Sequence, residues 1–226
     1  MRRTPLPPEY ARSPFTVRDA DLPPKRMRAN DLERTIHGVR MVRGSRPLTL
    51  VERCQMLAVR LRDDAVFSHT TAALLHGAPL DLRWERSPII HMTVPAEEAS
   101  PHATGIRGHH APIAAADVSL AHGLRITTPA RTWCDLSRML TLGDLVAAGD
   151  YFIHHRMPLT TSAELSLRVQ GMAGRRGVRT AREAVVLLND HAESRPESHL
   201  RVILVLAGFQ PEVNHVLVDT QTGREL

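Results

Sequence analysis

The C-terminal segment, residues 193–226, constrains the fold most, because it carries strong signals for both the start and the end of a helix. Ser194 suits the N-cap, and Glu197 stands where a capping box places its acid. The run Leu200–Ala207 is almost entirely apolar, which predicts a helix that is buried on most sides. Gly208 is expected to end that helix.

A hairpin is expected after this helix. Residues 214–218 are expected to form a strand with Val216 and Val218 on one face and His215 and Leu217 on the other, and a turn follows at 219–223. Only three residues then remain for the returning strand. Such a short second arm is marginal by itself, so the chain is expected to stop inside a domain.

Basic side chains are concentrated at the other end of the chain. Residues 1–47 contain eleven basic and five acidic side chains, a net charge of +6, whereas the whole chain has +5. A local positive charge suits nucleic-acid phosphates, because their neutralisation releases counterions. A solvated basic arm is the alternative, and the proline-rich stretch 1–14 is expected to be extended.

Two helices are expected next, over residues 15–20 and 25–34. In the second helix, Ala29 and Leu32 fall on an apolar face, and polar side chains fall opposite. The second helix therefore resembles a recognition helix, with residues 36–42 as a wing. Side chains expected to approach bases are Arg26, Asn30 and Arg34, and those expected to hold phosphates are Lys25, Arg28 and Arg40. A helical pair with a merely solvated basic face remains the alternative.

The central region predicts a mixture of helices and strands. A helix over residues 50–62 is followed by a capped helix from Ser68, and strands are expected at 89–94, 106–110 and 124–127. Helix starts are marked by Thr128-Pro129, Thr141, Thr161 and Thr180. These elements predict an α+β fold.

Several kinds of chemistry are disfavoured by the sequence. Cys54 and Cys134 stand far apart without a C-x-x-C motif, which disfavours a disulfide framework or a structural zinc site. The thirteen histidines form no H-E-x-x-H motif, so structural or surface roles are expected for them and no metal site is predicted. Neither a G-x-S-x-G nor a P-loop motif is found. No apolar run is long enough to span a bilayer, and a cytoplasmic protein is expected.

The segments MRANDLERTIHGVR, FSHTTAALLHGAPL, GIRGHH and LRITTPARTWCDLS occur in the order found in bacterial proteins with an AbiEi-type antitoxin region, which the chain resembles. The later segment PESHLRVILVLAGFQPEVN resembles the opening of a very-short-patch-repair-like endonuclease domain of the PD-(D/E)XK type. The first resemblance implies a winged helix that binds double-stranded DNA, followed by an α+β domain and, in some systems, a nucleotidyltransferase-type toxin as partner.

The second resemblance implies a nuclease that uses Mg²⁺, with Glu197 as the helix carboxylate. The strands that would supply the other metal ligands are not present in the sequence, so Glu197 is at most a catalytic remnant, and its role as a capping acid is the preferred interpretation. No cofactor is therefore expected.

The predicted organisation is α+β, with a basic arm and winged helix-turn-helix at 1–47, an α+β domain at 48–158, a helical linker at 159–192 and an incomplete endonuclease-like segment at 193–226. The predicted function is a catalytically inert DNA-binding transcriptional regulator or antitoxin of a toxin-antitoxin or phage-defence type system, which could act as a homodimer on paired half-sites. The alternatives are an endonuclease whose catalytic part lies outside this chain and a module that binds a protein toxin.

Overall fold

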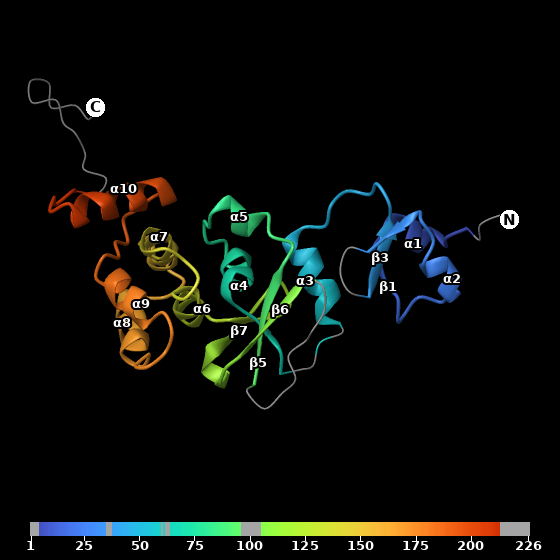
Figure 1. The fold of residues 1–226 in the computed structure, drawn as a ribbon, viewed down its shortest axis with the longest axis horizontal. Coiled ribbons are helices and arrows are strands. Elements are labelled where there is room, and N and C mark those ends of the chain that lie inside the picture. Colours follow the sequence, from blue (N-terminus) through green and yellow to red (C-terminus); the bar gives the residue numbers. More distant parts are fainter. Residues whose placement is uncertain (1–4, 35–37, 60, 62–63, 96–104, 213–226) are drawn as a thin grey trace, which may run out of the picture. The chain divides into compact units, whose positions relative to one another are not determined.

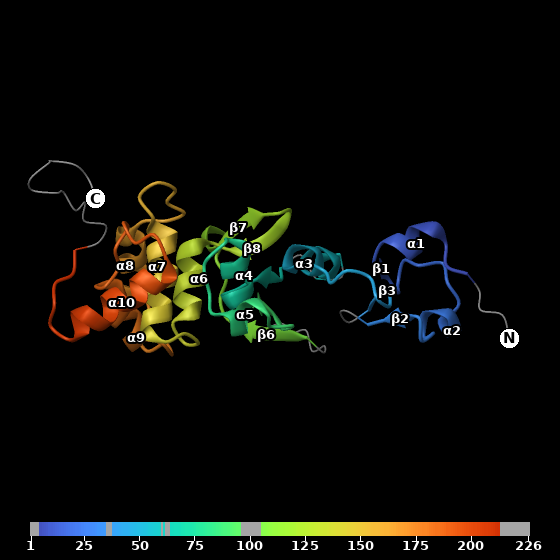
Figure 2. The same cartoon turned by 90° about the horizontal axis from the view of Figure 1, so that it is seen from above.

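The computed structural model describes residues 5–34, 38–59, 61, 64–95 and 105–212. The chain divides into two compact units, with residues 1–67 and 87–126 in unit 1 and residues 68–86 and 127–226 in unit 2. Figures 1 and 2 show the helices and strands of each unit. The fold is α+β, as the sequence predicts.

The N-terminal module, residues 5–47 of unit 1, is built on a small antiparallel sheet. Its elements are α1 (Pro8–Arg12), β1 (Phe15–Thr16), α2 (Pro24–Met27), β2 (Leu32–Glu33) and β3 (Val39–Val42). The strand order is β1-β3-β2, and both outer strands run antiparallel to β3. The sheet buries four apolar side chains, namely Phe15, Leu32, Val39 and Met41.

The helix expected over residues 15–20 is not formed. Phe15 and Thr16 instead pair with Arg40 and Val39 of β3, and the Phe15 ring is buried. The Asp19 N–H donates to Thr16 Oγ1 at 3.3 Å, which closes a turn directly after the strand. Burial of one aromatic ring on the sheet outweighs the weak helical pattern of this short segment.

The rest of unit 1 combines a helix and a larger sheet. Helix α3 (Leu50–Ala58) begins with a capping box in which Thr49 and Glu52 exchange hydrogen bonds. The sheet has the order β6-β5-β4-β8-β7, formed by β4 (Val66–Phe67), β5 (Ile90–Val94), β6 (Ile106–His110), β7 (Val118–Ala121) and β8 (Leu124–Thr127). A 3₁₀ turn, η1 (Ala115–Asp117), precedes β7. Strand β5 runs parallel to β6 and antiparallel to β4.

Unit 2 is helical in the residues that the structure describes. Its helices are α4 (His69–Leu75), α5 (Leu82–Glu85), α6 (Pro129–Leu136), α7 (Leu142–Ile153), α8 (Ser162–Gln170), α9 (Val178–Val185) and α10 (Arg195–Leu206). Helix α7 contacts α6, α9 and α10, and both views show it among these helices (Figures 1 and 2). The fully buried Trp133 lies in this core and donates from Nε1 to Leu145 O at 2.9 Å.

Close packing in this core requires one glycine. At Gly149, in the middle of α7, an added Cβ would lie 2.4 Å from Leu188 Cδ2 and 2.7 Å from Trp133 Nε1. Any larger residue would push the indole ring away from its hydrogen bond with Leu145 O.

The sequence predicts helix starts where a threonine cap is followed by an acid or a proline. Most of these starts are found where expected. Thr128, Thr141 and Thr161 accept hydrogen bonds as N-caps of α6, α7 and α8. The start predicted at Thr180 is wrong, because α9 already begins after Gly177, whose φ of +85° suits glycine. In the described part of the chain, no helix combines the length and the apolarity that a membrane span requires.

Candidate nucleic-acid interface

The predicted recognition helix is much shorter than expected. Helix α2 ends at Met27, and Arg28 takes the C-cap position. A turn through Asn30 and Asp31 then leads directly into β2. The helix predicted over residues 25–34 is therefore wrong beyond its first turn, because Leu32 is drawn into the sheet, where it pairs with Val42.

Arg26 does not lie on the exposed face that the helical pattern predicted. It is only 7% exposed, and its two terminal guanidinium nitrogens each donate to one oxygen of Asp31 at 2.9 Å. A bidentate pair of this kind fixes both side chains. The assignment of Arg26 to base contacts is thus corrected: the residue ties α2 to the following turn.

Two arginines of the β3 region hold the backbone around the end of α2. Arg40 Nε donates to Met27 O at 3.0 Å, and Arg43 Nε donates to Asn30 O at 2.8 Å. The N–H of Arg43 also donates to Asp31 O at 2.8 Å. A cation at the last carbonyls of a helix is electrostatically favourable. Arg40, predicted to hold phosphates, therefore uses at least part of its donor set within the module.

The remaining polar side chains of this region face solvent. Those that are exposed are Lys25, Arg28, Asn30, Arg34 and Arg43. Burial and then the charge of Arg34 lower the pKa of Arg40 from its usual value, so these cations lie close enough to repel one another. The arrangement gathers positive charge around the end of α2 and the β2–β3 pair.

Glu197 behaves as a capping residue. Ser194 Oγ accepts from the Glu197 N–H at 3.3 Å, and the Glu197 carboxylate accepts from the N–H of Glu193 at 2.9 Å. These contacts satisfy backbone donors at the start of α10. The predicted helix between Ser194 and Gly208 is confirmed, whereas the strand expected at residues 214–218 lies outside the described residues.

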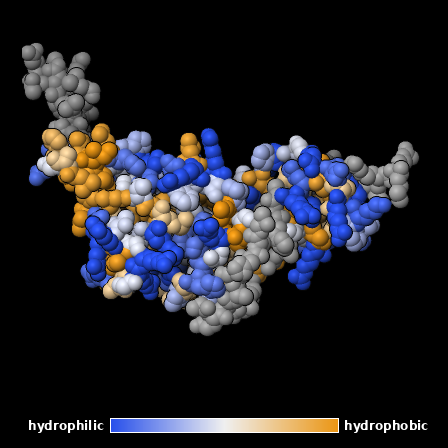
Figure 3. All heavy atoms as spheres, in the orientation of Figure 1, coloured by the Kyte–Doolittle hydropathy of each residue, from blue (hydrophilic) through white to orange (hydrophobic). Residues whose placement is uncertain are grey.

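Helix α10 is less buried than its sequence suggests. One face packs against α7 through Ser198, Arg201 and Val202. Apolar side chains on other faces are exposed, and Figure 3 shows an apolar surface over α10. They are Leu200 (58%), Ile203 (64%) and Leu206 (66%), and Phe209 (63%), which follows the helix, is exposed as well. The prediction of burial on most sides is therefore wrong for the described contacts of this helix.

Two aspartates of α7, for which the sequence predicted no such role, hold α10 in place. Asp150, 1% exposed, accepts from Ser198 Oγ and from Arg201, each at 2.6 Å. Burial raises the pKa of Asp150, although Ser198, Asn189 N–H and Arg201 all donate to it. These residues lie on different helices, and only their tertiary contacts reveal the network.

Asp144 forms a second anchor nearer the start of α7. It accepts from Arg195 at 2.6 Å and from His199 Nε2 at 3.1 Å. Burial opposes ionisation of Asp144, but hydrogen bonds from Arg195 and Thr141, followed by the charges of Arg195 and His199, lower its pKa below the usual value. Asp144 and Asp150 therefore both accept hydrogen bonds from residues of unit 2, which accounts for their burial without a ligand.

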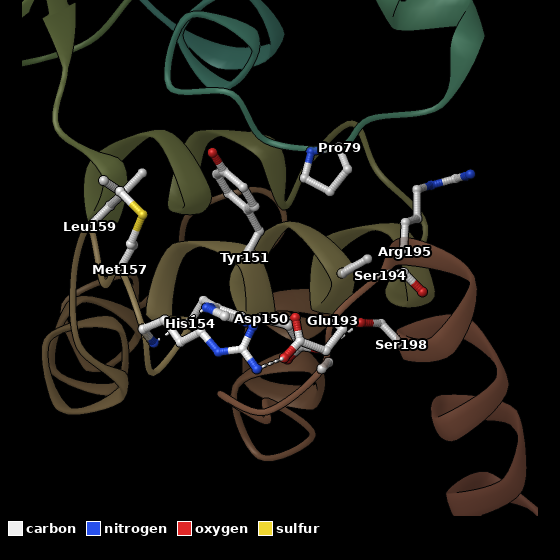
Figure 4. A pocket seen from close by; sticks show the side chains of 13 residues that line it. Pro79, Asp150, Tyr151, His154, Met157, Leu159, Glu193, Ser194, Arg195 and Ser198 are labelled. Atoms are coloured by element: carbon white, nitrogen blue, oxygen red, sulfur yellow. Dashed lines mark hydrogen bonds and ion pairs between the residues drawn. The ribbon is translucent and has the colours of Figure 1, made fainter. Parts of the chain in front are cut away.

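A pocket of about 320 Å³ lies beside this network in unit 2, and Figure 4 shows its lining. Its walls are largely apolar, with Pro79, Tyr151 and Met157 among them. At its rim Glu193 pairs with Arg156 at 3.2 Å and with His154 at 3.4 Å. The charged groups at the rim thus neutralise one another, which leaves mainly shape and apolar contact for recognition.

The two cysteines have the character that the sequence predicts. Cys54 and Cys134 are buried free thiols. Burial raises the pKa of each thiol to about 12, so neither provides a thiolate nucleophile at neutral pH.

Comparisons with known proteins add little to these observations. No protein-family model matches the chain, and no curated protein matches it. Among solved structures, the chain is similar to the crystal structure of the Rv2827c protein from Mycobacterium tuberculosis, with 16% identity and a TM-score of 0.47 over 81% of this chain and 67% of that chain. A similarity at this level does not extend to function.

Proposed function

We propose that the N-terminal module binds double-stranded DNA. The observation that carries the proposal is the gathering of exposed Arg28, Arg34 and Arg43 around the end of α2, next to an exposed Asn30. Guanidinium groups contact phosphates and guanine edges, and an asparagine amide pairs with adenine. Asn30 would supply base contacts, and the arginines would position the duplex.

The local architecture supports the same proposal. Helix α2 is followed by the antiparallel strands β2 and β3, and in the proposal α2 with its following turn faces the duplex and the strands lie beside it. Strand β3, which makes up most of the wing predicted at residues 36–42, would lie against the phosphates. Anchoring of the α2 end by Arg40 and Arg43 would present Asn30 from a fixed turn.

The resemblance to AbiEi-type antitoxins suggests the biological role of such binding. A transcriptional regulator or antitoxin acting in the cytoplasm fits a module that contacts DNA, and a nucleotidyltransferase-type toxin would be its partner. In this role the chain needs no catalytic metal, and Glu197 remains a capping residue.

The proposal is tested by duplex binding as a function of salt concentration. The double substitution Arg28→Ala/Arg34→Ala is expected to weaken binding to mixed-sequence duplex DNA. It should also reduce the slope of log K against log salt by about two, because each arginine would neutralise one phosphate. Fluorescence anisotropy with a labelled duplex between about 50 and 200 mM salt measures both quantities.

A matched control removes the same charge elsewhere. Arg125→Ala/Arg182→Ala also deletes two exposed arginines, but both lie outside the module, and this variant is expected to bind with the wild-type slope. Equal weakening in the two variants would show that binding follows overall charge, and an unchanged Arg28→Ala/Arg34→Ala variant would refute the interface.

A further inference from the structure

Two histidines of unit 1 meet on one face of the larger sheet. Strands β5 and β6 are parallel, and their register pairs His91 with Arg107 and Thr93 with His109. His91 and His109 therefore point to the same side of the sheet, because side chains two residues apart share a face. Their rings are stacked, with centroids 5.1 Å apart and planes at 15°.

The ring nitrogens are aimed at one another. His91 Nδ1 and His109 Nε2 are 2.9 Å apart, which is a hydrogen-bond distance. A single proton lies between two nitrogens in such a pair, so one nitrogen donates and the other accepts through its lone pair. When the donor ring takes its other tautomer, the proton moves to that ring's other nitrogen, and two lone pairs are then directed at the same point.

The two rings are shielded from water to different degrees. His91 is 3% exposed, and His109 is half-buried. Neutral imidazole is the form that ligates transition metals.

We propose that His91 and His109 bind a divalent transition-metal ion, with Zn²⁺ as the best fit, at the position of the proton that they share, while that proton moves to the other nitrogen of the donor ring. Imidazole nitrogen favours zinc, copper or nickel over magnesium or calcium. Two nitrogens bound to tetrahedral Zn²⁺ at about 2.0–2.1 Å lie about 3.3 Å apart, so the pair needs to open by only ~0.4 Å. The site does not depend on the proposed DNA binding of the N-terminal module.

The proposal is tested by titrating Zn²⁺ into the full chain by calorimetry, and Co²⁺ as a spectroscopic probe of nitrogen ligation. His109→Gln is the main variant, because glutamine still offers a hydrogen-bond partner to His91 but is a poor zinc ligand. We expect this substitution to weaken Zn²⁺ binding by at least about tenfold. It should also abolish the Co²⁺ absorption bands.

His110→Ala is the matched control, since it removes one imidazole from the neighbouring position of β6, on the opposite side of the strand. It is expected to bind Zn²⁺ as the wild type does. Zn²⁺ should raise the melting temperature of the wild type and of His110→Ala, but not of His109→Gln. Equal affinity of the two variants, or absence of Zn²⁺ binding by the wild type, would overturn the proposal.

Discussion

Two arginines of the N-terminal module, Arg40 and Arg43, differ from Arg195 and Arg201 of unit 2 in whether their guanidinium groups contact a carboxylate. In the module, Arg40 and Arg43 donate to neutral backbone carbonyls. In unit 2, Arg195 and Arg201 donate to the carboxylates of Asp144 and Asp150. A carbonyl leaves the charge of its arginine in place, whereas a carboxylate cancels it.

This difference explains why a modest overall charge is compatible with a strongly basic surface. The net charge of +5 belongs to the whole chain, but the first 47 residues alone carry +6. Within the module, the Arg26 charge is neutralised in a buried bidentate pair, whereas Arg40 and Arg43 keep theirs. Contacts of individual arginines, more than their number, therefore indicate where a polyanion would bind.

The largest expected effect comes from breaking an arginine–carboxylate pair in unit 2. Asp150→Ala would leave Arg201, which is 7% exposed, without its carboxylate partner in the core. Removal of one partner from a buried ion pair destabilises a protein by about 3–5 kcal/mol. Urea unfolding followed by far-UV circular dichroism measures the decrease in the free energy of unfolding.

The matched control is Glu183→Ala, which breaks the exposed pair with Arg179 on α9. Surface pairs are screened by solvent, so this variant should unfold at the wild-type urea concentration. If Asp150→Ala also unfolds there, the buried network does not hold α10.

The second-largest expected effect distinguishes Arg26, the buried arginine of the module, from its exposed arginines. Arg26→Ala removes both hydrogen bonds to Asp31 and should destabilise the module by about 1–3 kcal/mol, because a partly buried carboxylate loses its donors. Arg28→Ala should leave stability within about 0.5 kcal/mol of the wild type while weakening DNA binding.

Hydrogen exchange of amides in β2 and β3 reports this difference locally. Faster exchange in Arg26→Ala, but not in Arg28→Ala, would agree with the structural role of Arg26. Faster exchange in Arg28→Ala, or loss of DNA binding by Arg26→Ala without any change in exchange, would contradict the division between the two residues.

Elements with local signals could be predicted from the sequence. The strands at 106–110 and 124–127 and the helices capped by Thr141 and Ser194 are found as expected, because alternation and capping act within a few residues. The end of α2 could not be predicted, because it depends on a contact across a turn and not on a local signal. Arg26 and Asp31 pair across a turn, and a helical pattern that places Arg26 outward cannot show this.

The histidine pair shows the same limit. Both strands were predicted, but the parallel register that brings His91 beside His109 is a property of the assembled sheet. Sequence motifs detect ligands that are close together in the chain, so they could not indicate that these two histidines meet. The exposed positions of Lys25, Asn30 and Arg34 were predicted, since exposure follows from polarity more than from exact secondary structure.

The smallest expected effect concerns acid pH and Asp144, the second anchor of α10. The folded protein lowers the pKa of Asp144, so its contribution to stability is present above the pKa of the unfolded chain, about 4. That contribution is lost as pH falls through the lower pKa of the folded state, because protonation removes the charge that Arg195 contacts. Asp144→Asn should thus be less stable than wild type near neutral pH, and the gap should close as the pH falls from about 4 through the lower pKa of the folded state. Urea midpoints measured for both proteins across this range give the difference directly, and titration of the other carboxylates cancels in it. If the difference between the two urea midpoints does not change with pH, Asp144 stays ionised or makes no net contribution to stability. In that case α10 would depend on Asp150 and apolar packing.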